Sequence, residues 1–203
     1  MFTATPLGPG QNVHDIVQQV IDGNPPPWAV AGDDRLLHME RVAALLSDWA
    51  AVLGLPTADR LRWRAAGLLH DLLRDADPDE LRDRVAPGLR ELPGPILHGP
   101  AAAERLRIEG VEDGELLTAV AFHTVGDDRF GALGRALYAA DFLEPGRTFL
   151  PEWRQELRGR MPEALDEVVR EIVGARIGNC LDRGAAILSR TVAFWNQLAQ
   201  DQA

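Results

Sequence analysis

Four of the five histidines in this chain form an ordered series with two aspartates, and each lies in a short apolar or glycine-bearing stretch. In chain order the series is His38, His70, Asp71, His98, His123 and Asp141. Imidazole and carboxylate groups are ligands for iron, manganese, zinc and nickel. Six such groups, one of them a carboxylate that can bridge, are enough for two metals about 3.5–4 Å apart, an arrangement that hydrolyses phosphate esters and anhydrides. The series therefore predicts a dinuclear metal hydrolase.

Each position taken singly also fits a purely structural role. His70 and Asp71 follow the apolar stretch 65–69, where a histidine can be a hydrogen-bonded core residue and an aspartate a polar helix end. Asp141 lies in the apolar run 137–143 with no arginine within one helical turn, and buried charges are normally paired or bound to metal. The remaining histidine, His14, has no such context and is expected to be an ordinary helical residue. The conjunction of the six positions, not any one of them, favours a metal site.

Apolar residues recur at helical spacing along most of the chain, which predicts an all-α fold of about eight to ten helices. Asn12 is the expected N-cap of the first helix, and Asp33 or Asp34 that of the second, whose apolar stripe runs from Leu37 to Leu53. Further helices are expected at 57–69, from 78 onward, and at 100–108, 114–123, 132–143, 152–160, 163–179 and 189–199. No run shows the period-two alternation of a strand. Residues 1–11 are expected to form a flexible arm, and 12–200 a single domain.

Composition narrows the class of protein. A net charge of −10 argues against general affinity for nucleic acid, which requires a basic face. The single cysteine, Cys180, cannot form an intramolecular disulfide. No secretory signal is visible and no apolar stretch approaches the roughly 18 residues that span a bilayer, so the cytoplasm is the expected compartment. All 21 basic residues are arginines, so arginine must fill any role that lysine would take.

Five segments together carry a resemblance to a known family. They are 35–43, 66–71, 98–100, 123–126 and 140–147, and a weaker likeness continues to Asn196. Through them the chain resembles the HD-domain superfamily of metal-dependent phosphohydrolases, an all-helical fold. Within it the chain is most similar to the YqeK-like symmetrical bis(5′-nucleosyl)-tetraphosphatase family. A bare His-Asp pair is unspecific, whereas the pattern Ala-Asp-x-x-Glu-Pro-x-Arg at 140–147 is highly specific.

The resemblance implies a di-iron centre, a preference for diadenosine tetraphosphate, symmetric cleavage to two ADP, and a homodimer. One metal would be held by His38, His70, Asp71 and Asp141, and the other by His98 and His123. Asp71 would bridge the two metals, and a hydroxide between them would attack phosphorus. Manganese, zinc and nickel remain alternatives to iron, because histidine and carboxylate ligands suit several metals.

The resemblance also implies a set of substrate-binding residues. They are Arg35, Arg74, Thr124, Gly126, Glu144 and Arg147. The arginines would neutralise the polyphosphate, because guanidinium matches phosphate geometry in a bidentate manner. For Arg35 and Arg74 a solvated surface position is the alternative. Asp71 and Arg74 are the residues expected to take part in catalysis, and Glu144 is expected to orient Arg147 or a ligand.

Three features depart from the family pattern. Arg74 stands where HD enzymes commonly have lysine, and the tract 101–103 is all alanine where the family tends to have Gly-Ala, which would narrow the space near the second metal. The prolines at 25–27, followed by Trp28, resemble an insertion that would line or shield the site.

Two other functions stay open. The first is an HD phosphohydrolase acting on another nucleotide, such as a nucleoside phosphate, a cyclic dinucleotide or an alarmone. The second is a nucleotide-binding protein that retains the scaffold without catalysis. The motif at 144–147 favours the tetraphosphatase over the first, and the intact set of six ligands argues against the second.

Overall fold

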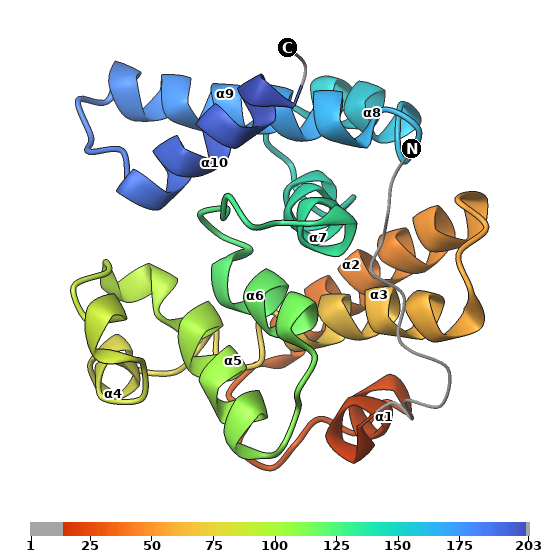
Figure 1. The fold of residues 1–203 in the computed structure, drawn as a ribbon, viewed down its shortest axis with the longest axis vertical. Helices are drawn as coiled ribbons and strands as arrows, with labels where there is room; N and C mark the ends of the chain where they lie inside the picture. Colours follow the sequence, from red (N-terminus) through yellow and green to blue (C-terminus); the bar gives the residue numbers. More distant parts are fainter. Residues whose placement is uncertain (1–13, 202–203) are drawn as a thin grey trace.

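A computed structural model describes residues 14–201, which form ten α-helices and no strand (Figure 1). The helices are α1 (Asp15–Ile21), α2 (Asp33–Val52), α3 (Thr57–Leu69), α4 (Pro78–Arg82), α5 (His98–Ile108), α6 (Gly114–Phe122), α7 (Ala132–Leu143), α8 (Pro151–Gly159), α9 (Leu165–Asp182) and α10 (Ser189–Gln200). Two 3₁₀ turns, η1 (Pro87–Leu89) and η2 (Gly94–Ile96), separate α4 from α5. The all-α prediction is confirmed. No helix in the described part of the chain is long and apolar enough to cross a membrane.

The starts of the first two helices differ from the prediction. α1 begins after His14, whose Nδ1 atom accepts a hydrogen bond from the Ile16 N–H at 3.3 Å, so the prediction that Asn12 caps this helix is wrong. Asn12 and the proposed arm 1–11 lie outside the described residues. α2 begins after Gly32 without a side-chain cap, and the acidic pair that follows occupies its first turn instead, where negative charge is favourable.

The buried face of α2 also differs from the expected stripe at its N-terminal end. Leu37 is 57% exposed, so its assignment to the apolar stripe is wrong. The face that α2 turns to the core runs through His38, Val42 and Leu46, at intervals of four residues. Leu37 precedes this face by about 100° and therefore points to solvent. A polar histidine takes the place that the sequence pattern gave to leucine.

α7 lies at the centre of the molecule, between two groups of helices. In Figure 1, α8, α9 and α10 lie on one side of it, and α2, α3 and α6 on the other. It contacts each of these helices, and its contact with α10 includes the edge-to-face pair of Tyr138 and Phe194, whose ring centroids are 5.4 Å apart. The largest fully buried side chains include Trp63, Tyr138, Phe194, Leu46 and Leu69. α7 therefore brings the C-terminal helices into the same core as the helices that carry the histidines.

A buried ion network fixes the start of α6 relative to α3. The Nε atom of Arg62 donates to Asp113 at 2.6 Å, and its other nitrogens donate to Glu115 at 3.1 Å and Asp59 at 3.2 Å. Burial opposes the charge of Arg62, but the hydrogen bond to Asp113 and the charges of Asp113 and Glu115 raise the pKa of Arg62. Since Asp113 also caps α6 by accepting from the Leu116 N–H, one arginine ties the two helices together.

The close approach of α2 and α3 depends on Gly67. A Cβ atom at this position would lie 2.5 Å from the Ala43 Cα atom on α2 and 2.6 Å from its backbone nitrogen. Side-chain atoms do not approach backbone this closely, so only glycine allows the two helices to pack at this distance. Since His70 lies one turn after Gly67 on α3 and His38 lies on α2, this contact sets the separation of two members of the histidine series.

We expect Gly67→Ala to lower the free energy of unfolding by about 1–3 kcal/mol, because the added methyl group has no space without a shift of α3. Urea unfolding followed by circular dichroism measures this change. Gly178→Ala is the matched control: Gly178 is also helical but has open space around it, so alanine there should stabilise the chain by about 0.5–1 kcal/mol. Similar effects of the two substitutions would contradict the packing argument.

Candidate metal centre

The six residues of the series meet in one buried cluster, with Asp71 at its centre. The Oδ1 atom of Asp71 lies 3.0 Å from the Nε2 atom of His98 and 3.4 Å from that of His123. Its Oδ2 atom lies 3.5 Å from the Nε2 atom of His70 and 3.8 Å from that of His38. Each oxygen of this one carboxylate therefore faces a different pair of histidines. Such a carboxylate has the form of a bridge between two cation sites.

Asp141 completes the side of the cluster that contains His38. Its Oδ1 atom lies 3.2 Å from the Nε2 atom of His38, and all six side chains are buried. They come from separate elements: His38 from α2, His70 and Asp71 from the end of α3, His98 from the start of α5, His123 from the end of α6 and Asp141 from the last turn of α7. Helices distant in the sequence thus converge on Asp71.

Three of the histidines use their Nδ1 atoms in the same way. The Nδ1 atom of His70 bonds to the Gly67 carbonyl at 2.8 Å, that of His98 to the Pro95 carbonyl at 3.0 Å, and that of His123 to the Val120 carbonyl at 2.8 Å. In each case the acceptor is three residues earlier in the chain. Carbonyl groups near the end of a helix or turn lack a helical partner, so a histidine there can satisfy one of them. A carbonyl only accepts, so each Nδ1 carries the proton.

His38 cannot use a carbonyl in this way, because it lies inside α2, where the carbonyls are already bonded. Its Nδ1 atom instead lies 3.2 Å from the Oε2 atom of Glu144, which is 2% exposed. Glu144 also accepts hydrogen bonds from Arg41 and from the Gly146 N–H. A carboxylate behind a histidine fixes the ring and its tautomer, as is common for histidines that bind metals.

The Nε2 atoms of all four histidines consequently face the cluster as hydrogen-bond acceptors. Those of His98 and His123 lie 3.1 Å apart, so two lone pairs point toward each other. Those of His38 and His70 are buried and have no hydrogen-bond partner among residues 14–201. Acceptors that face acceptors in a buried site are costly unless a proton or a metal cation lies between them. The donor set therefore fits metal ions, with two groups of three ligands that share Asp71: His38, His70 and Asp71, and Asp71, His98 and His123.

The charge states of the cluster suit metal binding. Burial alone would raise the pKa of Asp71, but the imidazoles of His70, His123 and His98 around it hold it well below its usual range. Burial lowers the pKa of His98, and the neighbouring His123 and Arg74 act in the same direction, against the Asp71 carboxylate. The pKa of Asp141 is lowered as well: burial opposes ionisation, but the His38 imidazole and the charge of Arg147 outweigh it. The carboxylates are thus ionised and His98 neutral at neutral pH, the forms that coordinate metals.

A polar pocket of about 630 Å³ opens beside the cluster at His38. The two arginines that line it bind the carboxylates of the series. Arg35 donates to Asp71 Oδ2 at 2.7 Å, and Arg147 donates to Asp141 Oδ1 at 2.6 Å. Their side chains are 26% and 41% exposed, so each guanidinium links the buried cluster to solvent. The pocket places two cations of the expected substrate-binding set at the mouth of the site.

The remaining residues of that set lie in different surroundings. The Thr124 hydroxyl is 3.1 Å from the Nε2 atom of His123, at the edge of the cluster. Arg74 is half-buried near His98, on which its charge acts. Gly126 has φ +80°, and a Cβ atom there would lie 2.1 Å from the Phe194 ring. Gly126 therefore allows a tight turn against α10, because a side chain at this position would collide with Phe194.

The turn after His123 is held by the two C-terminal helices. Arg176 on α9 donates to the Thr124 carbonyl at 2.6 Å, and Thr191 on α10 donates to the Val125 carbonyl at 2.9 Å. Arg190 pairs with Asp127, which is fully buried. Sequence reasoning did not assign these residues to the site, and their signal was weak, since their partners lie more than 50 residues away. α9 and α10 thus fix the position of His123.

Comparison with known proteins agrees with this geometry. The model of the HD domain family matches residues 35–172, which include all six residues of the series. The symmetrical bis(5′-nucleosyl)-tetraphosphatase of Halalkalibacterium halodurans is 27% identical over 176 residues, 84% of this chain and 91% of that protein. Its namesake from Staphylococcus aureus is 30% identical over 122 residues, 57% of this chain and 61% of that protein. The protein of the same name from Bacillus subtilis is 29% identical over 100 residues, 45% of this chain and 53% of that protein.

A solved structure shares the fold. The crystal structure of a predicted HD superfamily hydrolase involved in NAD metabolism from Clostridium acetobutylicum superimposes with a TM-score of 0.75. The superimposed region covers 95% of this chain and 100% of that chain, at 24% sequence identity. The resemblance stated from the sequence motifs is confirmed at the level of family and fold.

Proposed function

The chain belongs to the HD domain family, and on that premise we propose that it is a metal-dependent phosphohydrolase that cleaves dinucleoside tetraphosphates symmetrically. Diadenosine tetraphosphate is the proposed main substrate, and two ADP the products. The observation that carries the proposal is the Asp71 carboxylate, whose two oxygens face two different pairs of histidines. The names of the three curated relatives support the substrate.

We assign the six residues of the series as the metal ligands, with Asp71 shared between two ions and Asp141 on the side of His38. When bound, two metal ions lower the pKa of water and offset negative charge on the phosphate oxygens. The ligands contribute two carboxylate charges and four neutral imidazoles, so the protein leaves most of the cationic charge free to act on the substrate. Iron is the proposed metal on the resemblance alone, with manganese, zinc and nickel as alternatives.

The chain's own residues bind and orient the polyphosphate. Arg35 and Arg147 lie at the mouth of the cluster, where their guanidinium groups can bind phosphate oxygens and offset the charge that develops in the transition state. Arg74 is near enough to His98 to act on the same region. The cluster itself is buried, so bulk water is largely excluded there and the charges of its carboxylates act in a medium of lower dielectric constant. Because an arginine remains protonated at neutral pH, Arg74 acts by its charge and not by donating a proton.

Two further parts of the proposal are a homodimer, which the resemblance implies, and a cytoplasmic location, which is the expectation from the sequence. Size-exclusion chromatography with light scattering tests the first, and elemental analysis of protein purified without oxygen tests the metal. Neither result depends on the choice of nucleotide substrate.

Product analysis tests the reaction. Purified protein, loaded anaerobically with iron or manganese, should convert diadenosine tetraphosphate to ADP as the only nucleotide product. In H₂¹⁸O, one of the two ADP molecules should carry a single ¹⁸O atom, because water attacks only one of the two central phosphorus atoms. Formation of AMP and ATP would contradict symmetric cleavage. Tight nucleotide binding without turnover would show that the scaffold binds but does not catalyse, and turnover of a different nucleotide in a substrate panel would reassign the substrate.

A further inference from the structure

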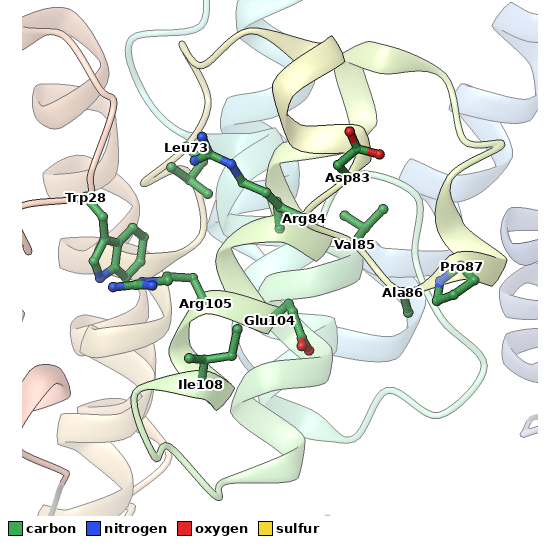
Figure 2. A pocket seen from close by; sticks show the side chains of 11 residues that line it. Trp28, Leu73, Asp83, Arg84, Val85, Ala86, Pro87, Glu104, Arg105 and Ile108 are labelled. Carbon is green, nitrogen blue, oxygen red and sulfur yellow. The ribbon is translucent and has the colours of Figure 1, made fainter.

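A second cavity, of about 640 Å³, lies along α5 and is apolar on most of its surface (Figure 2). We call it the α5 groove; its walls include Trp28, Leu73, Val85, Ala101, Arg105 and Ile108. Its volume is in the range of small-molecule sites, which combine apolar and aromatic walls with a few polar groups. None of the six residues of the metal cluster lines it.

The α5 groove nevertheless shares α5 and the turn after Asp71 with the metal cluster. Ala101, Arg105 and Ile108 follow His98 at intervals of three, seven and ten residues, so they lie on the side of α5 that carries His98. Leu73, on the opposite wall, is two residues from Asp71. At about 1.5 Å per residue, Arg105 is about 10 Å along the helix axis from His98. The groove and His98 thus lie on the same helix, about two turns apart.

Trp28 forms one wall and is held there by the segment that follows it. The Val30 N–H donates to the Leu72 carbonyl at 2.7 Å, and the Asp75 N–H donates to the Val30 carbonyl at 3.1 Å. These bonds attach the segment to the turn after Asp71. The segment that follows the prolines at 25–27 therefore places an aromatic side chain in the α5 groove and not in the pocket at His38.

The indole of Trp28 has an unused donor. Its Nε1 atom is buried and has no hydrogen-bond partner among the described residues. The Arg105 guanidinium lies 6.0 Å from the ring centroid, and Figure 2 shows the two side chains together at one side of the groove, with Arg84 across from them. Two acids, Asp83 and Glu104, also line the groove, but Glu104 is bonded twice to Arg107, at 2.7 and 2.8 Å.

We propose that the α5 groove binds the nucleoside of one half of the substrate, with the purine ring against Trp28. This inference rests on the proposed function and adds a specificity site to it. A purine offers a flat apolar face for the indole, and stacking of a base on an aromatic side chain is a common source of affinity. Arg84 and Arg105, which now pair with Glu80 at 3.2 Å and Glu109 at 2.6 Å, would turn to the phosphates that join this nucleoside to the metal cluster.

Calorimetric titration of the metal-loaded protein with ADP and, separately, with inorganic pyrophosphate tests the groove. Trp28→Ala should weaken ADP binding about tenfold, because the stacking surface is lost, and should leave pyrophosphate binding within twofold of the original. Trp28→Phe should restore most of the ADP affinity. Ile108→Glu should also weaken ADP binding selectively; Ile108 is 61% exposed, so the core is not disturbed. Leu181→Glu, at 66% exposure on α9, is the matched control and should change neither affinity.

Unchanged ADP affinity in both Trp28→Ala and Ile108→Glu would overturn the groove proposal. An equal loss of ADP and pyrophosphate affinity would also overturn it, since the substitutions would then act on the metal cluster. The proposed function fails separately, if the original protein does not hydrolyse diadenosine tetraphosphate. Even in that case, selective loss of ADP binding in the variants would indicate a nucleoside site, on a protein that catalyses another reaction.

Discussion

Asp71→Ala should lower kcat/KM for diadenosine tetraphosphate by more than about 1,000-fold and reduce the metal content to less than one ion per chain. Asp71 is the only carboxylate of the series with one oxygen facing His98 and His123 and the other facing His38 and His70. Without it, each side of the cluster loses an anionic ligand, and four neutral imidazoles remain with only Asp141 to balance two divalent charges. Neither metal site keeps its donor set.

Elemental analysis and steady-state kinetics on the same preparation measure the two effects. Asp48→Ala is the matched control, because Asp48 is an exposed aspartate on α2 and its removal should leave metal content and kcat/KM unchanged. Circular dichroism establishes that the variant is folded. If the Asp71 variant still holds two metals per chain, the assignment of Asp71 as the bridge is wrong, whatever happens to the activity.

The convergence of the histidine series was predictable from the sequence for a physical reason. His70 and His123 each follow a helix end, and His98 follows a 3₁₀ turn. At such ends carbonyl groups are free, and in all three cases the histidine bonds to the carbonyl three residues before it. The transition from apolar helix to tight turn, visible in the sequence, is therefore the local structure that fixes each imidazole. The helix boundaries from α3 onward agree with the prediction to within about three residues.

The parts that the sequence did not predict depend on contacts between distant segments. The hold of α9 and α10 on the turn after His123 joins residues 52 and 66 positions apart, through Arg176 and Thr191. No local pattern indicates such a pair. Leu37 was misassigned because periodicity counts apolar residues, whereas the buried face of α2 contains His38. The rule that apolar residues mark the buried face of a helix fails where a polar residue of a functional site is buried.

Glu144 was expected to contact the substrate or to orient Arg147 or a ligand, and its geometry favours the orientation of a ligand. Its carboxylate lines the pocket at His38 but lies behind that histidine, where it also accepts from Arg41 and the Gly146 N–H. Burial opposes its ionisation, yet the hydrogen bond from Arg41 and those from Gly146 and His38 hold its pKa below the usual value. An ionised acceptor on Nδ1 raises the basicity of the imidazole and fixes its Nε2 atom toward the cluster.

Glu144→Gln should therefore weaken metal binding on the side of His38 by about 10–100-fold, and KM for diadenosine tetraphosphate at saturating metal should stay within about twofold. The glutamine keeps the shape of the side chain but loses the charge that holds Arg41 and polarises His38. Metal titration of the apoprotein gives the first quantity, and kinetics at several metal concentrations give the second. Glu40→Gln makes the same chemical change at an exposed position on α2 and should alter neither. A higher KM with unchanged metal affinity would instead identify Glu144 as a substrate contact. The two roles differ because a group behind His38 acts through the metal, whereas a group at the mouth of the site acts on the phosphate directly.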